Sequence, residues 1–405
     1  MSDREALRAE VEAALEGLLR RRDPNAKKTV MGAGADDVEP GRRYLAALAP
    51  GGWYVPTWPT EYGGRGARRD EVAAIQEALR GYETPDMYPF LVGIGLVGPA
   101  VRDMGAPEQC QRWLPSIANG STIWCQLFSE PDAGSDLANL ATRAERDGDI
   151  WRVNGQKVWS SRAHYSDMGI LLARTNLDVP KHAGITAFAI DMHQPGVEVR
   201  PLVQINGDKH FNEVFLNDAI VRDEDRIGDV GQGWAVAIAV LGYERASVGG
   251  GGGGAGAEGG GTFARLTSMA RTNGLAADPA FRQRLADLYT ANQASRWTAQ
   301  RARDATKSGG RPGPEGSGGK VRLTYTLQTT GRLAKAGQGA AGMLSGDEWD
   351  TIFLTGPSMS IRGGTDEIQR NILGERVLGL PPEPRLDKDV PFNQVRRTGV
   401  PGAGG

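Results

Sequence analysis

The chain has 405 residues, of which 40% are hydrophobic, so it is long enough for two or three domains with buried cores. A formal net charge of −2 without a long basic run disfavours nucleic acid and anionic membranes as partners. Two cysteines, a charged N-terminus and the lack of a long apolar run favour a cytoplasmic protein without a disulfide framework, signal peptide or transmembrane segment.

Residues 1–120 are predicted to be mainly helical. Apolar residues recur at helical spacing in 6–19 and again in 70–82, with charged residues between them. Further helices are expected at 87–104 and at 107–117, where a proline suits the first turn.

Residues 121–230 change to short apolar or alternating runs bounded by turns, which predicts a compact β domain. A first strand is expected at 123–128, before a turn rich in proline and glycine. A hairpin is expected next, with strands at 151–153 and 157–159 joined by a tight Asn-Gly turn. Further strands are predicted at 169–173, 185–190, 197–203 and 211–215.

The chain is predicted to be helical again beyond residue 231. A glycine run at 249–254 should end the first of these helices near residue 248, since glycine costs about 1 kcal/mol per residue in a helix. The tail that begins at Pro381 is rich in proline and charge, and it is predicted to be mobile. The other helices are predicted at 262–273, 279–306, 320–344 and 365–377.

The turn after the first strand is the first candidate site. Its backbone N–H groups and the hydroxyls of Ser129 and Ser135 have no strand partner, so they can face a polar, anionic ligand. Trp159 and Ser161 are expected at a nearby strand end. An ordinary turn and hairpin in a β domain explains these residues equally well. Four histidines without ligand-like spacing give no reason to expect a metal site.

Two runs in this region resemble the acyl-CoA dehydrogenase family. They read Glu-Pro-Asp-Ala-Gly-Ser-Asp at 130–136 and Asn-Gly-Gln-Lys-Val-Trp-Ser-Ser at 154–161. The resemblance extends from Trp-Pro-Thr-Glu-Tyr-Gly-Gly at 58–64 to Gly-Gly-Thr-Asp-Glu-Ile-Gln-Arg-Asn at 363–371. It covers nearly the whole chain, and the motifs together are highly specific.

The resemblance implies an α+β multidomain fold with FAD bound non-covalently between the β domain and a C-terminal four-helix bundle. The domains would be an N-terminal α-helical domain at 1–120, a middle β domain at 121–230, the bundle at 231–380 and a tail at 381–405. The implied reaction is the α,β-dehydrogenation of an acyl-CoA thioester. An electron-transferring flavoprotein is the implied acceptor.

Dehydrogenation needs a base for the α proton, donors for the developing enolate and an electron sink, which side chains cannot supply. By resemblance, Ser161 approaches N5 of the flavin, which takes the β-hydride, and Ser135 lies near the phosphate-bearing portion of CoA. The implied flavin contacts are Gln126, Leu127, Phe128, Ser129, Gly134, Ser135, Trp159, Ser160, Ser161, Arg311, Gln338, Thr365 and Glu367. The implied substrate contacts are Ser135, Tyr243, Arg245 and Gly364.

The base is the first departure from the common family pattern. Many members carry the catalytic glutamate where this chain has Gly363, which keeps only its backbone N–H as an enolate donor. A second branch carries the base in a Glu-Arg pair on the helix after the β domain, which points to Glu244. The alternative is a plain charge pair at a helix end, although an idle carboxylate in so apolar a helix would be costly.

The second departure is the absence of the family's Arg-x-x-Phe-Gly run, which reaches the flavin of a neighbouring subunit. Arg311 either substitutes for its arginine or belongs to a plain linker, so a dimer or a mixed tetramer is predicted rather than a homotetramer. A catalytically inactive or flavin-sharing subunit, and a flavin oxidase acting on a carrier-bound thioester, are the alternative functions. The glycine run at 249–254 suggests room for a bulky or branched acyl group.

Overall fold

The computed structural model divides the chain into two compact units. The first contains residues 1–202, 209–240 and 385–405, and the second contains 203–208 and 241–384. The structure describes residues 3–23, 36–249, 255–307, 313–344 and 346–395.

The first unit begins with helices packed on one another through apolar stripes. Leu7, Val11 and Leu15 in α1 are spaced four residues apart, so they share one face, and that face is buried. The single helix expected at 87–104 is instead a π-helical turn followed by α4, because the prolines and glycines of this stretch interrupt regular helical hydrogen bonding. The helices are α1 (Asp3–Leu15), α2 (Glu39–Leu48), α3 (Arg69–Leu79), α4 (Gly98–Met104) and α5 (Pro107–Ala118).

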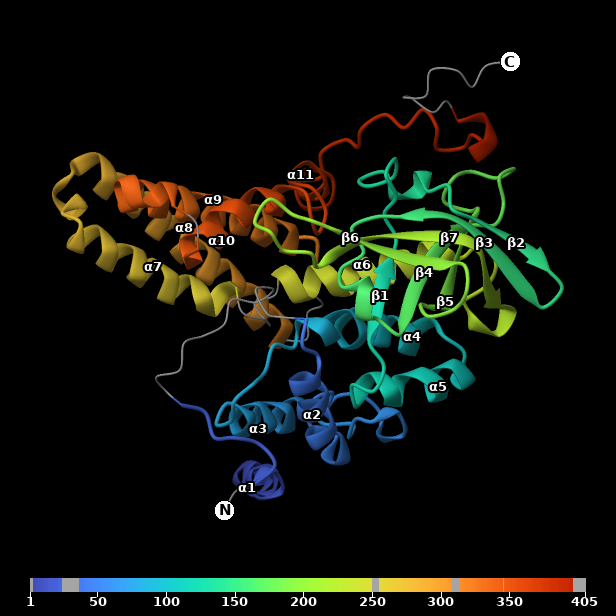
Figure 1. The fold of residues 1–405 in the computed structure, drawn as a ribbon, viewed down its shortest axis with the longest axis horizontal. Coiled ribbons are helices and arrows are strands. Elements are labelled where there is room, and N and C mark those ends of the chain that lie inside the picture. Colours follow the sequence, from blue (N-terminus) through green and yellow to red (C-terminus); the bar gives the residue numbers. More distant parts are fainter. Residues whose placement is uncertain (1–2, 24–35, 250–254, 308–312, 345, 396–405) are drawn as a thin grey trace. The chain divides into compact units, whose positions relative to one another are not determined.

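The β domain of the first unit is one mixed sheet (Figure 1). Its strand order is β6-β7-β3-β2-β4-β5-β8, and β1 pairs with β4 in parallel. Buried side chains of β1, β3, β4, β5 and β7 form its core. The strands are β1 (Trp124–Leu127), β2 (Arg143–Asp147), β3 (Ile150–Lys157), β4 (Met168–Arg174), β5 (Ile185–Asp191), β6 (Val197–Leu202), β7 (Phe211–Arg222) and β8 (Arg226–Ile227).

The predicted hairpin around Asn154 is wrong. Strand β3 runs straight through Asn154 and Gly155, and the tight turn lies earlier, between β2 and β3, where Gly148 has φ +64°. Asn154 bonds to Asp218 across the sheet, and the register of β3 against β7 shifts between Val153 and Gly155. A Cβ at Gly155 would lie 2.4 Å from the Thr142 hydroxyl, so glycine serves a close approach here rather than a turn.

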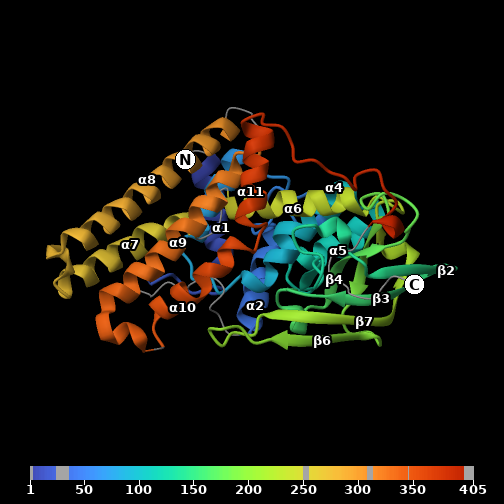
Figure 2. The same cartoon turned by 90° about the horizontal axis from the view of Figure 1, so that it is seen from above.

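The second unit is helical (Figure 2). Its core joins Leu266 and Ala270 of α7, Leu288 of α8, Leu333 of α9 and Trp349 of α10. Helix α7 begins at Ala255, earlier than predicted, and α10 was not predicted at all. Helix α6 begins in the first unit and ends in the second. The helices are α6 (Gly233–Gly249), α7 (Ala255–Thr272), α8 (Pro279–Lys307), α9 (Gly316–Gln338), α10 (Glu348–Thr355) and α11 (Asp366–Ile372).

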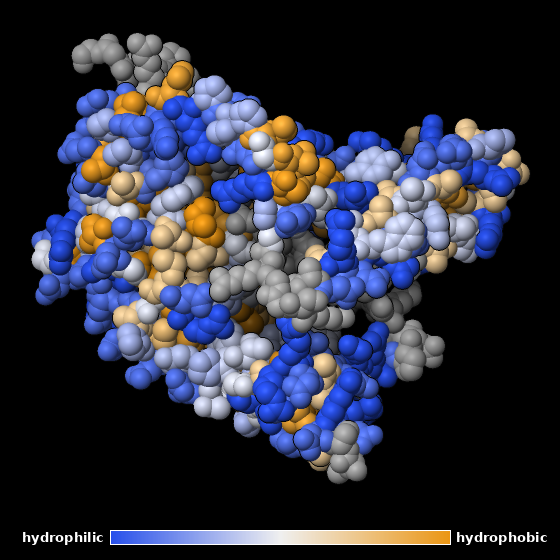
Figure 3. All heavy atoms as spheres, turned by 180° about the vertical axis from the view of Figure 1, so that it is seen from behind, coloured by the Kyte–Doolittle hydropathy of each residue, from blue (hydrophilic) through white to orange (hydrophobic). Residues whose placement is uncertain are grey.

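Large apolar side chains are exposed on the second unit, and Figure 3 shows apolar groups at several places on one face of the surface. Exposed apolar patches commonly mark interaction sites. No helix in the described ranges combines the length and hydropathy of a membrane span. The exposed residues near α10 and α11 are Phe353, Ile361, Val377, Leu378 and Leu380.

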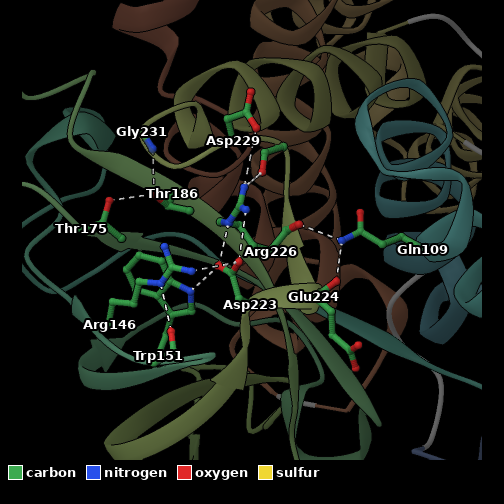
Figure 4. A network of polar contacts seen from close by, with 12 residues as sticks. Gln109, Arg146, Trp151, Thr175, Thr186, Asp223, Glu224, Arg226, Asp229 and Gly231 are labelled. Atoms are coloured by element: carbon green, nitrogen blue, oxygen red, sulfur yellow. Dashed lines mark hydrogen bonds and ion pairs between the residues drawn. The ribbon is translucent and has the colours of Figure 1, made fainter.

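Polar contacts fix α5 to the β domain (Figure 4). Gln109 donates from its amide nitrogen to the backbone carbonyls of Glu224 (2.8 Å) and Arg226 (2.7 Å). Asp223 accepts from the indole of Trp151 (2.8 Å) and from Arg226 (3.0 Å), and the Arg226 bond contributes most to lowering the pKa of Asp223. The N-terminal helices and the sheet therefore form one packed body within the first unit.

A buried ion pair joins the end of β1 to β3. Lys157 donates to the Glu130 carboxylate (2.8 Å) and to the Phe128 carbonyl (3.1 Å), and Glu130 also accepts from the N–H groups of Ala141 and Thr142. Burial opposes the charged form of Glu130, but Lys157 and these N–H groups outweigh burial, so the pKa of Glu130 is lowered. Burial lowers the pKa of Lys157, which the contact with Glu130 partly offsets.

Lys157→Met should leave the Glu130 carboxylate buried without a counterion and lower the free energy of unfolding by about 3 to 5 kcal/mol. The Glu130→Gln/Lys157→Met double variant should be less destabilised, because neither partner is then charged. Urea denaturation of the parent, Glu130→Gln, Lys157→Met and the double variant completes the cycle. Equal destabilisation of Lys157→Met and the double variant would contradict a charge-based role.

The exposed pair of Arg143 and Glu145 (3.1 Å) provides the control, and Arg143→Met should change stability little.

Because its folded pKa is lowered, Glu130 contributes stability above its ordinary pKa of about 4.5. That contribution should be lost as the pH falls through the lowered value.

Candidate functional site

The two sequence runs at 130–136 and 154–161 lie side by side in the first unit. The Val158 N–H donates to the Ser129 carbonyl (2.9 Å), beside the bonds from Lys157 to Phe128 and Glu130. Leu127 and Phe128 are buried, Gln126 on β1 is partly buried, and Ser129 is partly exposed at the turn. The structure therefore brings the predicted residues 126–129 next to the end of β3.

A strained loop follows β3. Trp159 and Arg162 have φ of +60° and +57°, in the left-handed region that side chains rarely adopt. The backbones of Ser160 and Asn212 exchange hydrogen bonds of 3.0 and 3.2 Å, which hold the loop in this shape. Strain of this kind commonly marks binding and catalytic sites.

The side chains of this loop suit a planar, polar ligand. The Trp159 indole is 60% exposed and meets Phe211 edge to face, with ring centroids 5.9 Å apart. Ser161 is partly exposed, and the buried Ser160 hydroxyl has no partner among the described residues. An exposed ring face beside hydroxyl groups fits an isoalloxazine ring, so the residues present are compatible with FAD.

The loop at 134–140 carries the other predicted contacts of the first unit. Gly134 and Ser135 are exposed, and a Cβ at Gly134 would meet nothing within 4 Å. Asp136, directly after Ser135, is paired with Lys181 (2.9 Å). The Ser135 hydroxyl is therefore accessible on a loop that is anchored at its next residue.

The second unit places Glu244 beside Gly363. A Cβ built at Gly363 would lie 3.6 Å from the Glu244 carboxylate. Gly363 and Gly364 have φ of +67° and +78°, and the Gln369 amide donates to the Gly363 carbonyl (2.9 Å). Thr365 then caps α11 by accepting from the Ile368 N–H (3.2 Å). The predicted site residue Glu244 and the predicted run at 363–365 are therefore neighbours.

The other predicted site residues beyond residue 241 are Gln338, Glu367, Tyr243, Arg245 and Arg311. Gln338 ends α9, donates to Asp347 and has a buried side-chain oxygen without a partner among the described residues. The Glu367 side chain is 78% exposed and lies 3.8 Å from Arg370. Tyr243 is partly buried. Arg311 and the Arg245 side chain lie outside the described part of the structure.

Two anchoring groups were not predicted from the sequence. Lys320 of α9 donates to Asp366 (2.8 Å), which also accepts from Thr324 (3.1 Å), and this buried group fixes the start of α11. Gln369 holds the glycine turn, and a Cβ on Gly364 would lie 2.6 Å from its amide nitrogen. Asp366 and Gln369 lie inside the run at 363–371, but no sequence signal pointed to Lys320.

Each unit thus offers a group of side chains suited to binding or catalysis. The first presents an exposed aromatic ring and hydroxyl groups on a strained loop. The second presents a carboxylate against a glycine turn whose peptide groups are held in place. A carboxylate beside peptide N–H groups can remove a proton and stabilise the resulting anion. No group of three potential metal-ligating side chains is found in the described ranges.

Family models match three successive parts of the chain. They are the acyl-CoA dehydrogenase N-terminal domain at residues 2–121, the middle domain at 125–219 and the C-terminal domain at 231–378. The chain is 40% identical over 349 residues to the acyl-CoA dehydrogenase IpdE1 of Mycobacterium tuberculosis, covering 84% of this chain and 88% of that protein.

Solved structures have the same fold. A structure titled Tcur3481-Tcur3483 steroid ACAD matches with a TM-score of 0.73 and 27% identity, over 94% of this chain and 98% of that chain. The ChsE4-ChsE5 complex from Mycobacterium tuberculosis matches with a TM-score of 0.71 and 26% identity, over the same shares. The predicted fold class, with helical N- and C-terminal domains around a middle sheet domain, is confirmed. The chain belongs to the acyl-CoA dehydrogenase family of FAD-dependent oxidoreductases.

Proposed function

We propose that the chain catalyses the α,β-dehydrogenation of an acyl-CoA thioester, with Glu244 as the base. The observation that carries the proposal is the contact between Glu244 and the Gly363 position, 3.6 Å from its carboxylate to a Cβ built there. Two family base positions thus lie within reach of one point, and only Glu244 carries a carboxylate. An electron-transferring flavoprotein is the proposed acceptor.

Each residue of the candidate site has a separate role in the proposed reaction. Glu244 removes the α proton, and the Gly363 N–H donates to the thioester oxygen, where negative charge develops. Gln369 holds the Gly363 peptide through its carbonyl, and Thr365 caps the helix that follows. FAD, when bound, supplies the electron sink for the β-hydride, and Ser129, Trp159 and Ser161 of the first unit would hold its ring.

Glu244→Gln should retain the fold and the flavin but lose turnover by roughly 10² to 10⁴-fold, the usual contribution of a general base. Anaerobic bleaching of the flavin by substrate measures this half-reaction without the natural acceptor. Adding Gly363→Glu to Glu244→Gln should restore a fraction of the rate, because a carboxylate returns to the same point. Recovery should be partial, since glutamate is strained at φ +67°.

Glu244→Gln/Gly363→Ala is the matched control, because it introduces the same backbone strain without a carboxylate and should recover nothing. If Glu244→Gln bleaches as fast as the parent, Glu244 is only a charge at a helix end. The proton then goes to another group, or the chain acts as a non-catalytic subunit.

We propose a bulky, branched or polycyclic acyl group as the substrate. The support is the glycine run at 249–254, which lacks side chains after Glu244 and lies almost wholly outside the described residues, and a solved relative whose title names a steroid ACAD. Glycine carries no side chain, so this stretch of sequence would add little bulk beside an acyl group.

A panel of acyl-CoA thioesters should therefore give the highest kcat/KM for polycyclic or branched acyl groups. The rate of flavin bleaching is the measurement, with short straight-chain thioesters as the comparison. Strong preference for short straight chains would remove the idea, and reaction with carrier-bound thioesters alone would favour the alternative oxidase activity.

We propose that the chain works in a dimer or a mixed tetramer. The solved relatives include a structure whose title names a ChsE4-ChsE5 complex. Exposed Phe353, Ile361 and Leu378 offer apolar surface for association on the second unit.

Light scattering together with flavin absorbance should therefore give fewer than one FAD per chain in a mixed assembly, or a dimer when the chain is expressed alone. Co-expression with a second acyl-CoA dehydrogenase chain is the comparison. A stable homotetramer with one FAD in every subunit would contradict the proposal.

A further inference from the structure

The C-terminal segment at 385–395 is docked on the β domain, contrary to the predicted mobile tail. Phe392 is buried and its N–H donates to the Val179 carbonyl (2.9 Å), and the Asn393 N–H donates to the Leu177 carbonyl (3.0 Å). The Asn393 amide also donates to Asp178 (2.7 Å). The last described part of the chain thus behaves as a piece of the first unit.

This segment reaches the 134–140 loop through Lys181. The Lys181 ammonium is buried and is shared between Asp136, at 2.9 Å, and Asp387 of the segment, at 2.6 Å. Burial opposes the charged form of Lys181, but the two carboxylates outweigh burial and raise its pKa. The pKa of Asp387 is lowered, most of all by its bond to Lys181. Asp136 directly follows the exposed Ser135.

A second connection runs through Arg174. This buried guanidinium donates to the carbonyls of Ala138 (2.6 Å) and Leu140 (3.0 Å), which lie in the other half of the loop. The ring of Phe392 covers it, with 3.8 Å between the guanidinium carbon and the ring centroid. The segment therefore supports both halves of the loop, by different chemistry and from residues five positions apart.

We propose that residues 385–395 are a positioning element that holds the 134–140 loop in the shape that receives the phosphate-bearing portion of a CoA thioester. The inference rests on the proposed function, since Ser135 is assigned to CoA there. Asp387 and Phe392 touch neither substrate nor flavin in this scheme. They act through Lys181 and Arg174.

The test uses the FAD-loaded protein, with its partner chain if one is required, and compares Asp387→Asn, Phe392→Leu and the double variant. The double variant should raise KM for the best acyl-CoA roughly tenfold, because misplacement remote from the reacting atoms still weakens binding. Flavin bleaching at saturating substrate should stay within about twofold of the parent, because Glu244 is unaffected. Phe392→Tyr keeps the ring over Arg174 and should behave as the parent.

Asp389→Asn is the matched control, because Asp389 is an exposed carboxylate of the same segment. Hydrogen exchange gives a readout independent of activity. The N–H groups of Asn139 and Leu140 are bonded within the loop, to Asp136 and Leu137, and should exchange faster in the double variant. If that variant does not fold, Asp387→Asn alone is read, since its side chain is partly exposed.

Unchanged exchange in the loop would overturn the positioning role, and so would faster exchange with an unchanged KM. Faster exchange with a raised KM and an unchanged limiting rate supports it. If no acyl-CoA bleaches the parent flavin, the proposed function fails. In that case the exchange measurement and the Kd of free CoA still decide whether the segment holds the loop for a CoA ligand.

Discussion

The ion pair of Glu130 and Lys157 is the contact on which the arrangement of the candidate residues in the first unit depends. It joins a residue just after β1 to the last residue of β3, so the two runs that carry the predicted flavin contacts cannot separate without exposing or orphaning a buried charge. The bond from Val158 to Ser129 continues the same connection toward Trp159. A buried ion pair is weak evidence for stability, but here it fixes which turn faces which strand end.

Left-handed backbone occurs among the candidate residues of both units. Trp159 and Arg162 adopt it with side chains, at a cost of the order of 1 kcal/mol or more each, whereas Gly363 and Gly364 adopt it at little cost. Between the strained pair, Ser160 bonds to Asn212, and Arg162 itself donates to the His210 carbonyl, while Gln369 holds the glycine pair. In each case a residue of a strand or helix, Asn212 of β7 or Gln369 of α11, bonds to the loop. The loop backbone is therefore held in place although it lies outside any strand or helix.

Resemblance and periodicity predicted the fold class and most strands, and they singled out both Glu244 and position 363. The Asn154-Gly155 pair led to the wrong hairpin prediction, because the sequence cannot show that Gly155 packs on Thr142 instead of turning the chain. The docked tail was missed for a similar reason. Its proline and charge content suggests mobility, but Phe392 and Asp387 find Arg174 and Lys181 more than 200 positions earlier in the chain. Pairings between distant residues are set by tertiary packing, which local composition does not encode.

The presence of glycine at 363 and glutamate at 244 has a common physical basis. A side chain at 363 would begin 3.6 Å from the Glu244 oxygen, so a second carboxylate there would lie close to the first. Like charges so close would raise the pKa of one carboxylate and leave it protonated. One carboxylate at this point is therefore the arrangement compatible with a charged base, and glycine at the other position keeps the peptide N–H while adding no charge.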